Sequence, residues 1–217
     1  MRTTARLAML VLTVAAVTAA RADEVAGTGR RAAPPERPAW EFGVTAYPTF
    51  VRGGENYTSV IAVADQGALH LEARYNYESI GARSAFAGWT FSGGEDFTWE
   101  LTPLLGGAWG DTRGFVPALE ASLGWKSIDF YLEGEYVRSG VDVRESYLYA
   151  WSELGYRPFQ WLRFGLAGQR TNTYDSGRDI QRGPFVQFTW RRMTIGGYWF
   201  NPGSDEQIVV SMIGISF

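Results

Sequence analysis

Residues 69–78 read LHLEARYNYE, an uninterrupted alternation of apolar and polar side chains. The odd-numbered positions carry apolar or aromatic groups: Leu69, Leu71, Ala73, Tyr75 and Tyr77. The even-numbered positions carry polar groups: His70, Glu72, Arg74, Asn76 and Glu78. Successive side chains of a β-strand point to opposite faces, so this period of two predicts a strand with one apolar and one polar face. On a helix the same acids would be scattered around the axis.

The alternation continues along the chain, and it is clear again in residues 115–126 and 128–137. Clusters of Gly, Pro, Asp and Asn mark the turns between such segments. Together these signals predict twelve strands, at residues 40–51, 57–65, 68–79, 84–92, 97–109, 114–126, 128–138, 146–156, 160–171, 180–191, 193–200 and 207–217. Most are as long as the roughly 9–11 residues that a tilted strand needs to cross a bilayer.

The connections between these strands alternate in length. Residues 138–145, 172–179 and 201–206 form long connections, whereas 65–67, 126–127 and 191–192 form tight turns. Longer loops on one side and short turns on the other are typical of an outer-membrane barrel. The sequence therefore predicts an all-β fold: a single antiparallel transmembrane β-barrel of about 12 strands, or 10 if two shorter segments do not cross, with short periplasmic turns and longer extracellular loops.

The composition excludes several other classes. The chain has 217 residues, 15% of them aromatic, with 26 Gly and no Cys, which fits neither a disordered chain nor a disulfide-stapled domain. Beyond residue 22 no apolar run approaches the roughly 20 residues of a membrane helix. A soluble sandwich or lipocalin-like barrel would also alternate, but Lys occurs only once in the chain. Aromatic residues near the strand ends predict two interfacial girdles: Trp40, Tyr77, Trp89, Trp109, Trp125, Tyr136, Tyr156, Trp161, Trp190 and Trp199.

The N-terminal region divides into two segments before the barrel. Residues 1–22 have a basic start, a short apolar stretch and an Ala-Arg-Ala end, the pattern of a secretory signal peptide. Residues 23–39 are rich in Pro and Arg and are expected to form a flexible periplasmic segment, which leaves 40–217 as the barrel. Cleavage would remove three arginines and no acid, so the formal charge of −3 would become −6. Nucleic acid is therefore not expected as a partner.

The C-terminal residues carry a family resemblance. Val209, Ile213, Ile215 and the terminal Phe217 share one face of the final predicted strand. This pattern resembles the terminal signature of bacterial outer-membrane β-barrel proteins. The resemblance implies export to the bacterial outer membrane, recognition of these four residues by the barrel assembly machinery, and contact with outer-membrane lipid and lipopolysaccharide. It specifies a class and a location but no activity.

The polar face of each predicted strand is expected to line the lumen of the barrel. The expected lumen residues are His70, Glu72, Arg74, Asn76, Glu100, Glu120, Lys126, Glu133, Glu135, Glu153, Arg163, Gln169 and Gln187. Acids outnumber bases among them, and two interpretations follow. The carboxylates could line a narrow pore for cations or small polar solutes. Alternatively, Glu and Arg could join into a closed, salt-bridged barrel with a structural or adhesive role.

Catalysis and cofactor binding have little support in the sequence. An outer-membrane hydrolase would need a nucleophile and a general base, and His70 is the one histidine. His70 lies on the polar, inward face of its predicted strand, whereas hydrolysis of lipid would need this side chain on the outer face. One His and no Cys do not make a zinc site of usual composition. The glycine run at 104–110 lacks the Lys-Ser/Thr of a phosphate-binding loop. The sequence therefore predicts a non-enzymatic protein with no cofactor and no metal.

Overall fold

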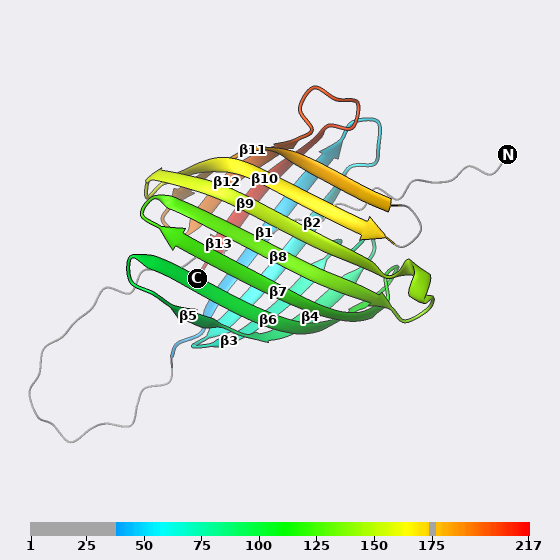
Figure 1. Cartoon of the computed structure of the whole chain (residues 1–217), viewed down its shortest axis with the longest axis horizontal. Helices are drawn as coiled ribbons and strands as arrows, with labels where there is room; N and C mark the ends of the chain where they lie inside the picture. Colours follow the sequence, from blue (N-terminus) through cyan, green and yellow to red (C-terminus); the bar gives the residue numbers. More distant parts are fainter. Residues whose placement is uncertain (1–37, 174–176) are drawn as a thin grey trace, which may run out of the picture.

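The computed structural model describes residues 38–173 and 177–217, so the predicted signal peptide and nearly all of the segment 23–39 lie outside it. The described chain is almost entirely β-strand (Figure 1). Its strands are β1 (Glu41–Val51), β2 (Tyr57–Gln66), β3 (Leu69–Tyr75), β4 (Arg83–Trp89), β5 (Phe91–Gly93), β6 (Phe97–Trp109), β7 (Gly114–Trp125), β8 (Ile128–Ser139), β9 (Tyr147–Phe159), β10 (Leu162–Thr173), β11 (Gly177–Trp190), β12 (Met193–Phe200) and β13 (Ile208–Ser216).

None of the described helical segments has the length and apolarity to cross a bilayer.

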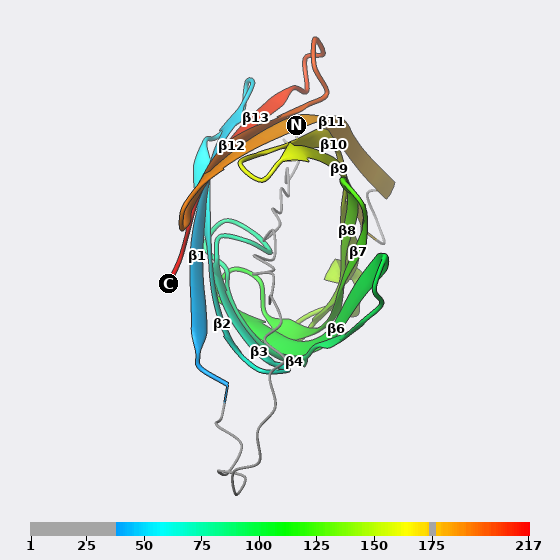
Figure 2. The same ribbon diagram turned by 90° about the vertical axis from the view of Figure 1, so that its left-hand side faces the viewer.

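The strands form one closed antiparallel barrel. Apart from β4 and β5, each strand pairs with its neighbours in the chain, and β13 pairs with β1 to close the ring. β4 and β5 both pair with β6 and are interrupted only at Thr90, so together they occupy one position in the wall. Figure 2 shows the ring of strands from one end. The predicted antiparallel barrel of twelve strands is confirmed, with β5 as one extra short strand.

Local turn chemistry sets where the strands end. The sequence predicts a strand from 68 to 79, but β3 ends at Tyr75 because Asn76 has a positive φ of 53°. The Asn76 side chain then stabilises the turn: its Oδ1 accepts from the Gly81 N–H at 2.8 Å, and its Nδ2 donates to the Thr58 carbonyl at 3.0 Å. Residues beyond position 75 therefore do not continue the alternation of the strand.

The two ends of the barrel differ mostly as predicted. The exception is the predicted long connection at 172–179, because Asn172 pairs with Arg178 and Thr173 with Gly177, so β10 and β11 extend into it. At one end the tight turns contain Gly67, Lys126 and Arg191, each with a positive φ that a two-residue hairpin turn requires. At the other end the connections are longer, and the one after β8 includes the 3₁₀ turn η1 (Val143–Glu145), capped by the Asp142 side chain.

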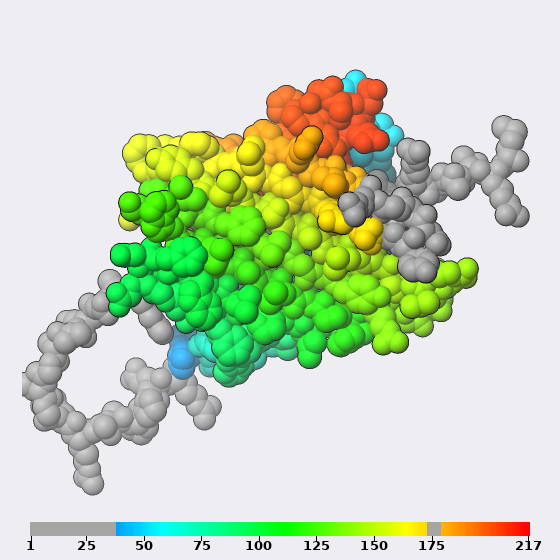
Figure 3. All heavy atoms as spheres, in the orientation of Figure 1, coloured from blue at the N-terminus to red at the C-terminus, as the bar shows by residue number. Residues whose placement is uncertain are grey.

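The outer face of the wall is apolar. Along β13 the outward Val209, Ile213 and Ile215 are 43 to 53% exposed, whereas Val210 and Met212 are buried inside. Figure 3 shows the outer side of the green and yellow strands as a continuous surface of side chains. An exposed apolar band of this extent is expected to face lipid rather than water.

The aromatic residues predicted to form the girdles lie on this outer face, with one exception. Nine of the ten girdle residues predicted above are exposed by 40% or more. Tyr77 is fully buried, so its assignment to a girdle is wrong. β3 has already ended at Tyr75, and the turn at Asn76 reverses the parity, which directs Tyr77 into the lumen.

Candidate functional site

The lumen contains a cluster of charged side chains around Arg74, which we call the Arg74 cluster. Its members are Arg74, Glu72, Tyr77, Glu133 and Glu135. The guanidinium Nε donates to Glu72 at 2.7 Å, and Nη1 donates to Glu133 at 3.0 Å and to Glu135 at 2.9 Å. The Tyr77 hydroxyl donates to Glu133 at 2.7 Å. Because β4, β6 and β7 lie between β3 and β8 in the wall, these bonds span part of the lumen.

The Arg74 cluster has an excess of negative charge. One guanidinium serves three carboxylates that are all almost fully buried. A fourth carboxylate, Glu120 on β7, stands directly opposite Glu133 in the β7–β8 register. Like charges placed opposite each other on neighbouring strands are destabilising. Within the described part of the chain, Oε1 of Glu135 also has no hydrogen-bond partner. The cluster therefore favours the binding of protons or cations.

A second group of charged and polar side chains surrounds Arg163, and we call it the Arg163 cluster. Its other members are Asp129, Glu153, Gln187 and Tyr198. Arg163 ion-pairs with Glu153 and donates from Nε to Asp129 at 2.8 Å and from Nη1 to Gln187 at 3.2 Å. The Tyr198 hydroxyl donates to Glu153 at 2.8 Å. The single guanidinium here meets two carboxylates, so this group is closer to balance than the Arg74 cluster.

Aromatic side chains also line the lumen, which the alternation of polar and apolar residues did not predict. Trp151 on β9 lies edge-on to Tyr198 and Phe200 on β12, with ring centroids 5.4 and 5.3 Å away. The Arg74 guanidinium lies over the rings of Tyr77 and Phe86, 4.2 and 4.3 Å from their centroids. A signal was present in the sequence, because in segments such as 208–213 both faces of the strand are apolar except at Ser211. Such a strand is buried on one side and faces lipid on the other.

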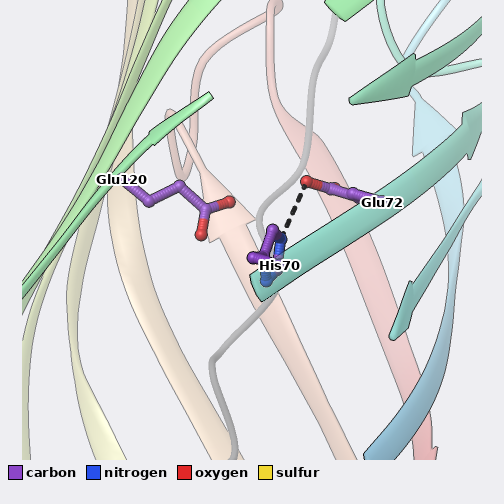
Figure 4. A group of neighbouring side chains, drawn as sticks. All are labelled: His70, Glu72 and Glu120. Carbon is purple, nitrogen blue, oxygen red and sulfur yellow. Dashed lines mark ion pairs between the residues drawn. The ribbon is translucent and has the colours of Figure 1, made fainter. Parts of the chain in front are cut away.

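His70 is the second residue of β3 and so lies close to the tight turn at Gly67. Figure 4 shows it with Glu72 and Glu120. Its Nδ1 is 2.7 Å from Oδ1 of Asp65, and its Nε2 is 3.7 Å from Oε2 of Glu72. Nε2 has no hydrogen-bond partner, so within the described residues no hydroxyl is bonded to either ring nitrogen.

Most residues predicted to line the lumen have inward side chains. Nine are buried: His70, Glu72, Arg74, Glu133, Glu135, Glu153, Arg163, Gln169 and Gln187. Glu100 and Glu120 are half-buried and share the parity of the buried neighbours Thr102 and Val116.

Two predicted lumen residues lie elsewhere. Lys126 is exposed in the tight turn after β7, with its Nζ 4.7 Å from the centroid of the Trp125 ring. Its positive φ takes it out of the strand alternation. Asn76 shapes the turn after β3, as described above. Without Lys126, Arg74 and Arg163 are the only Lys or Arg residues among the predicted lumen residues, and the acidic excess is larger than the sequence suggested.

Glu78 is a buried acid at the long-loop end of the barrel, in the connection between β3 and β4. It is 0% exposed; its Oε1 accepts from the Ser84 hydroxyl, and its Oε2 has no partner. Burial raises the pKa of the Glu78 carboxyl above its usual range. Its polar parity in the stretch 69–78 was the only sign of this position in the sequence.

No protein-family model and no curated protein matches the chain by sequence. Solved structures do match it by shape. The KdgM porin superposes with a TM-score of 0.58 at 10% identity, over 81% of this chain and 98% of that one. This chain shares the β-barrel fold of that porin. A second KdgM structure, described as a complex with disordered oligogalacturonate, also gives a TM-score of 0.58, at 9% identity and with the same coverage. OccK5 of Pseudomonas aeruginosa gives 0.44 at 9% identity over 80% of this chain and 62% of that one. At these identities the likeness concerns the fold alone.

Proposed function

We propose that this protein is a bacterial outer-membrane barrel that forms a narrow, cation-favouring pore for small polar solutes. The observation that carries the proposal is the excess of carboxylates in the lumen. Glu72, Glu133 and Glu135 share one guanidinium, and Glu120 stands opposite Glu133 and forms no ion pair with an Arg or Lys of the described residues. Carboxylates that line a pore attract cations and repel anions.

The porin fold supports a passage, and the charge of the lumen restricts what passes. A barrel of about twelve strands lies between the filled eight-stranded barrels and the open porins of 16 to 18 strands, so its contents decide what it conducts. Oligogalacturonate, the compound named with the KdgM porin, is an oligomer of a sugar acid. Such a polyanion would meet the carboxylates of the Arg74 cluster, and we expect this chain to exclude it.

A closed structural barrel is the second candidate, because a specific set of contacts favours it. The bonds from Arg74 to Glu133 and Glu135 join strands that are not neighbours. The contacts of Trp151 with Tyr198 and Phe200 do the same on the other side of the lumen. If these contacts persist in the membrane, the barrel would act as a scaffold for its loops or as an adhesin.

Single-channel recording separates the two candidates. The protein would be purified from the membranes of an expressing Gram-negative host and placed in planar bilayers under a KCl gradient. A pore gives discrete conductance with a cation-favouring reversal potential, and Glu133→Gln reduces the selectivity. The matched control, Glu55→Gln in the exposed β1–β2 loop, leaves it unchanged. Electrical silence of folded, heat-resistant protein would refute the pore and favour the scaffold.

The outer-membrane location and the partners that go with it belong to the same proposal. The apolar outer face and the exposed aromatic residues support contact with outer-membrane lipid and lipopolysaccharide. The exposed Val209, Ile213, Ile215 and Phe217 are available for recognition by the barrel assembly machinery. Fractionation of expressing cells tests this part. Recovery of the protein as a soluble monomer without detergent would overturn it.

A further inference from the structure

Three side chains that could bind a metal ion converge in the lumen. His70 and Glu72 come from the inner face of β3, and Glu120 comes from β7, with its carboxylate directed toward them (Figure 4). One ligand atom from each lies within 4.8 Å of the other two. Glu120 is far from the pair in sequence, so only closure of the wall brings the three together.

We propose that His70, Glu72 and Glu120 bind one divalent transition-metal ion, with Zn²⁺ preferred. His70 supplies Nε2, each glutamate supplies one carboxylate oxygen, and a water molecule completes the coordination. The inference goes beyond the proposed pore, because a closed barrel with these residues would bind the ion equally well.

The first argument is the unused nitrogen of His70. The residue is only 9% exposed, and its Nε2 has no hydrogen-bond partner although it faces Glu72. A buried polar atom without a partner is costly. The other nitrogen, Nδ1, is held by Asp65 at 2.7 Å. Metal-ligating histidines are usually oriented in this way by a carboxylate on the far nitrogen, which leaves the lone pair of the near nitrogen for the metal.

The second argument is charge. Arg74 is shared among Glu72, Glu133 and Glu135, and Glu120 has the like charge of Glu133 opposite it. A divalent cation between Glu72 and Glu120 would add positive charge where one guanidinium is shared among three carboxylates. Arg74 contacts both oxygens of Glu72, with Nε 2.7 Å from Oε1 and Nη2 3.1 Å from Oε2. Oε2, which has the longer of these two bonds, is 3.7 Å from His70 Nε2 and can still accept a metal ion through its second lone pair.

Ligand chemistry and reach favour zinc over magnesium or calcium. Imidazole suits Zn²⁺ and its neighbours in the transition series, whereas Mg²⁺ and Ca²⁺ prefer all-oxygen sites with more ligands. Bond lengths of roughly 2.0–2.2 Å around a tetrahedral Zn²⁺ place ligand atoms about 3.4 Å apart. The three groups must therefore close by on the order of 1 Å, and rotation of the half-buried Glu120 side chain provides that movement.

A direct binding measurement tests the site independently of conductance. Metal-free protein in detergent is titrated with Zn²⁺ against a chromophoric indicator, and Co²⁺ absorption reports the coordination of the same site. We expect one Zn²⁺ per chain, and at least a tenfold loss of affinity in Glu120→Gln and in His70→Gln. Asp65→Asn, which removes the partner of Nδ1, lowers affinity about 10- to 100-fold.

The matched control is Glu100→Gln. Glu100 is another half-buried inward carboxylate, on β6, and it contributes no ligand atom to the three-residue group. Its affinity for Zn²⁺ is expected to stay within about threefold of the parent protein. Heat-modified mobility on gels checks that each variant is folded. The absence of stoichiometric Zn²⁺ binding, or equal affinity in the parent, Glu120→Gln and His70→Gln proteins, would overturn the proposal, whatever the bilayer recordings give.

Discussion

Arg74 on β3 hydrogen-bonds Glu133 on β8 at 3.0 Å, although three positions of the barrel wall separate the two strands. The bond therefore crosses the lumen, and it links the charge balance of the interior to the stability of the barrel. Breaking a buried ion pair by removing one partner costs more than removing both, because the remaining charge is left uncompensated.

Arg74→Met is expected to destabilise the barrel by roughly 3–5 kcal/mol, since it leaves three buried carboxylates without their shared cation. Urea unfolding in lipid vesicles measures the free energy. Arg83→Met is the control: Arg83 is exposed and lies 5.5 Å from the Tyr75 ring centroid, an interaction worth about 1 kcal/mol or less. Equal losses in the two variants would show that the Arg74 contacts carry no special weight.

Trp151→Ala removes the largest fully buried side chain of the lumen, together with its bond to Glu153 at 3.1 Å. We expect a loss of about 3–5 kcal/mol in unfolding free energy, as for other buried aromatic residues. The outward Trp190, which is 67% exposed, provides the comparison. If Trp190→Ala cost as much as Trp151→Ala in the same vesicles, the aromatic contacts across the lumen would not explain the stability of the barrel.

Gly183→Ala tests the close approach of two strands. A Cβ at Gly183 would lie 1.8 Å from the Trp199 carbonyl oxygen, so β11 and β12 would have to separate there. Gly134→Ala is the matched control, because a Cβ at Gly134 meets nothing within 4 Å. The first variant is expected to lower the thermal midpoint of the heat-modifiable band, and the second to leave it unchanged or raise it slightly. The reverse order would contradict the packing described for β11 and β12.

The buried Glu78 carboxyl is expected to make the stability of the folded barrel depend on pH. Burial raises its pKa in the folded state, so the folded protein binds this proton more tightly than the unfolded chain does. The resulting stability is complete below the unfolded pKa, about 4.3, and is lost as the pH rises toward the folded pKa. Glu78→Gln removes this dependence. Urea unfolding at pH 4 and pH 7 measures the free energy of unfolding of both proteins. We expect this free energy to increase in Glu78→Gln relative to the parent protein as the pH rises. A difference that is the same at both pH values would refute the assignment.

Almost the whole fold could be predicted from the local sequence pattern. One face of each strand meets lipid and the other meets the lumen, so apolar and polar residues alternate along the strand. The stretch at 69–78 and the tight turns were sufficient for the strand order and for the location of most polar side chains. Lys126 and Tyr77 were misplaced for one reason: a positive φ at or just before each of them ends the alternation that the prediction extends.

Contacts across the lumen could not be predicted in the same way. Parity places Arg74, Glu120 and Glu133 inside the barrel, but which of them meet depends on the curvature and register of the closed wall. The inward aromatic residues were missed because an aromatic side chain on an alternating strand suits either face. The pairing of His70 with Glu120 likewise depends on tertiary structure rather than on spacing along the chain.

The pairing of β1 with β13 has a kinetic consequence. Every other contact in the wall joins strands that are adjacent in the chain, with β4 and β5 taken as one, whereas this seam brings Gly43 to Ser216. Neighbouring hairpins can form early, because little chain entropy opposes them, but the seam requires almost the whole described chain to be in place. Until it forms, both edge strands expose unpaired backbone groups that are costly in lipid. Closure of the seam is therefore expected to limit the rate of folding, and strand exchange between open sheets is the misfolding route that competes with it.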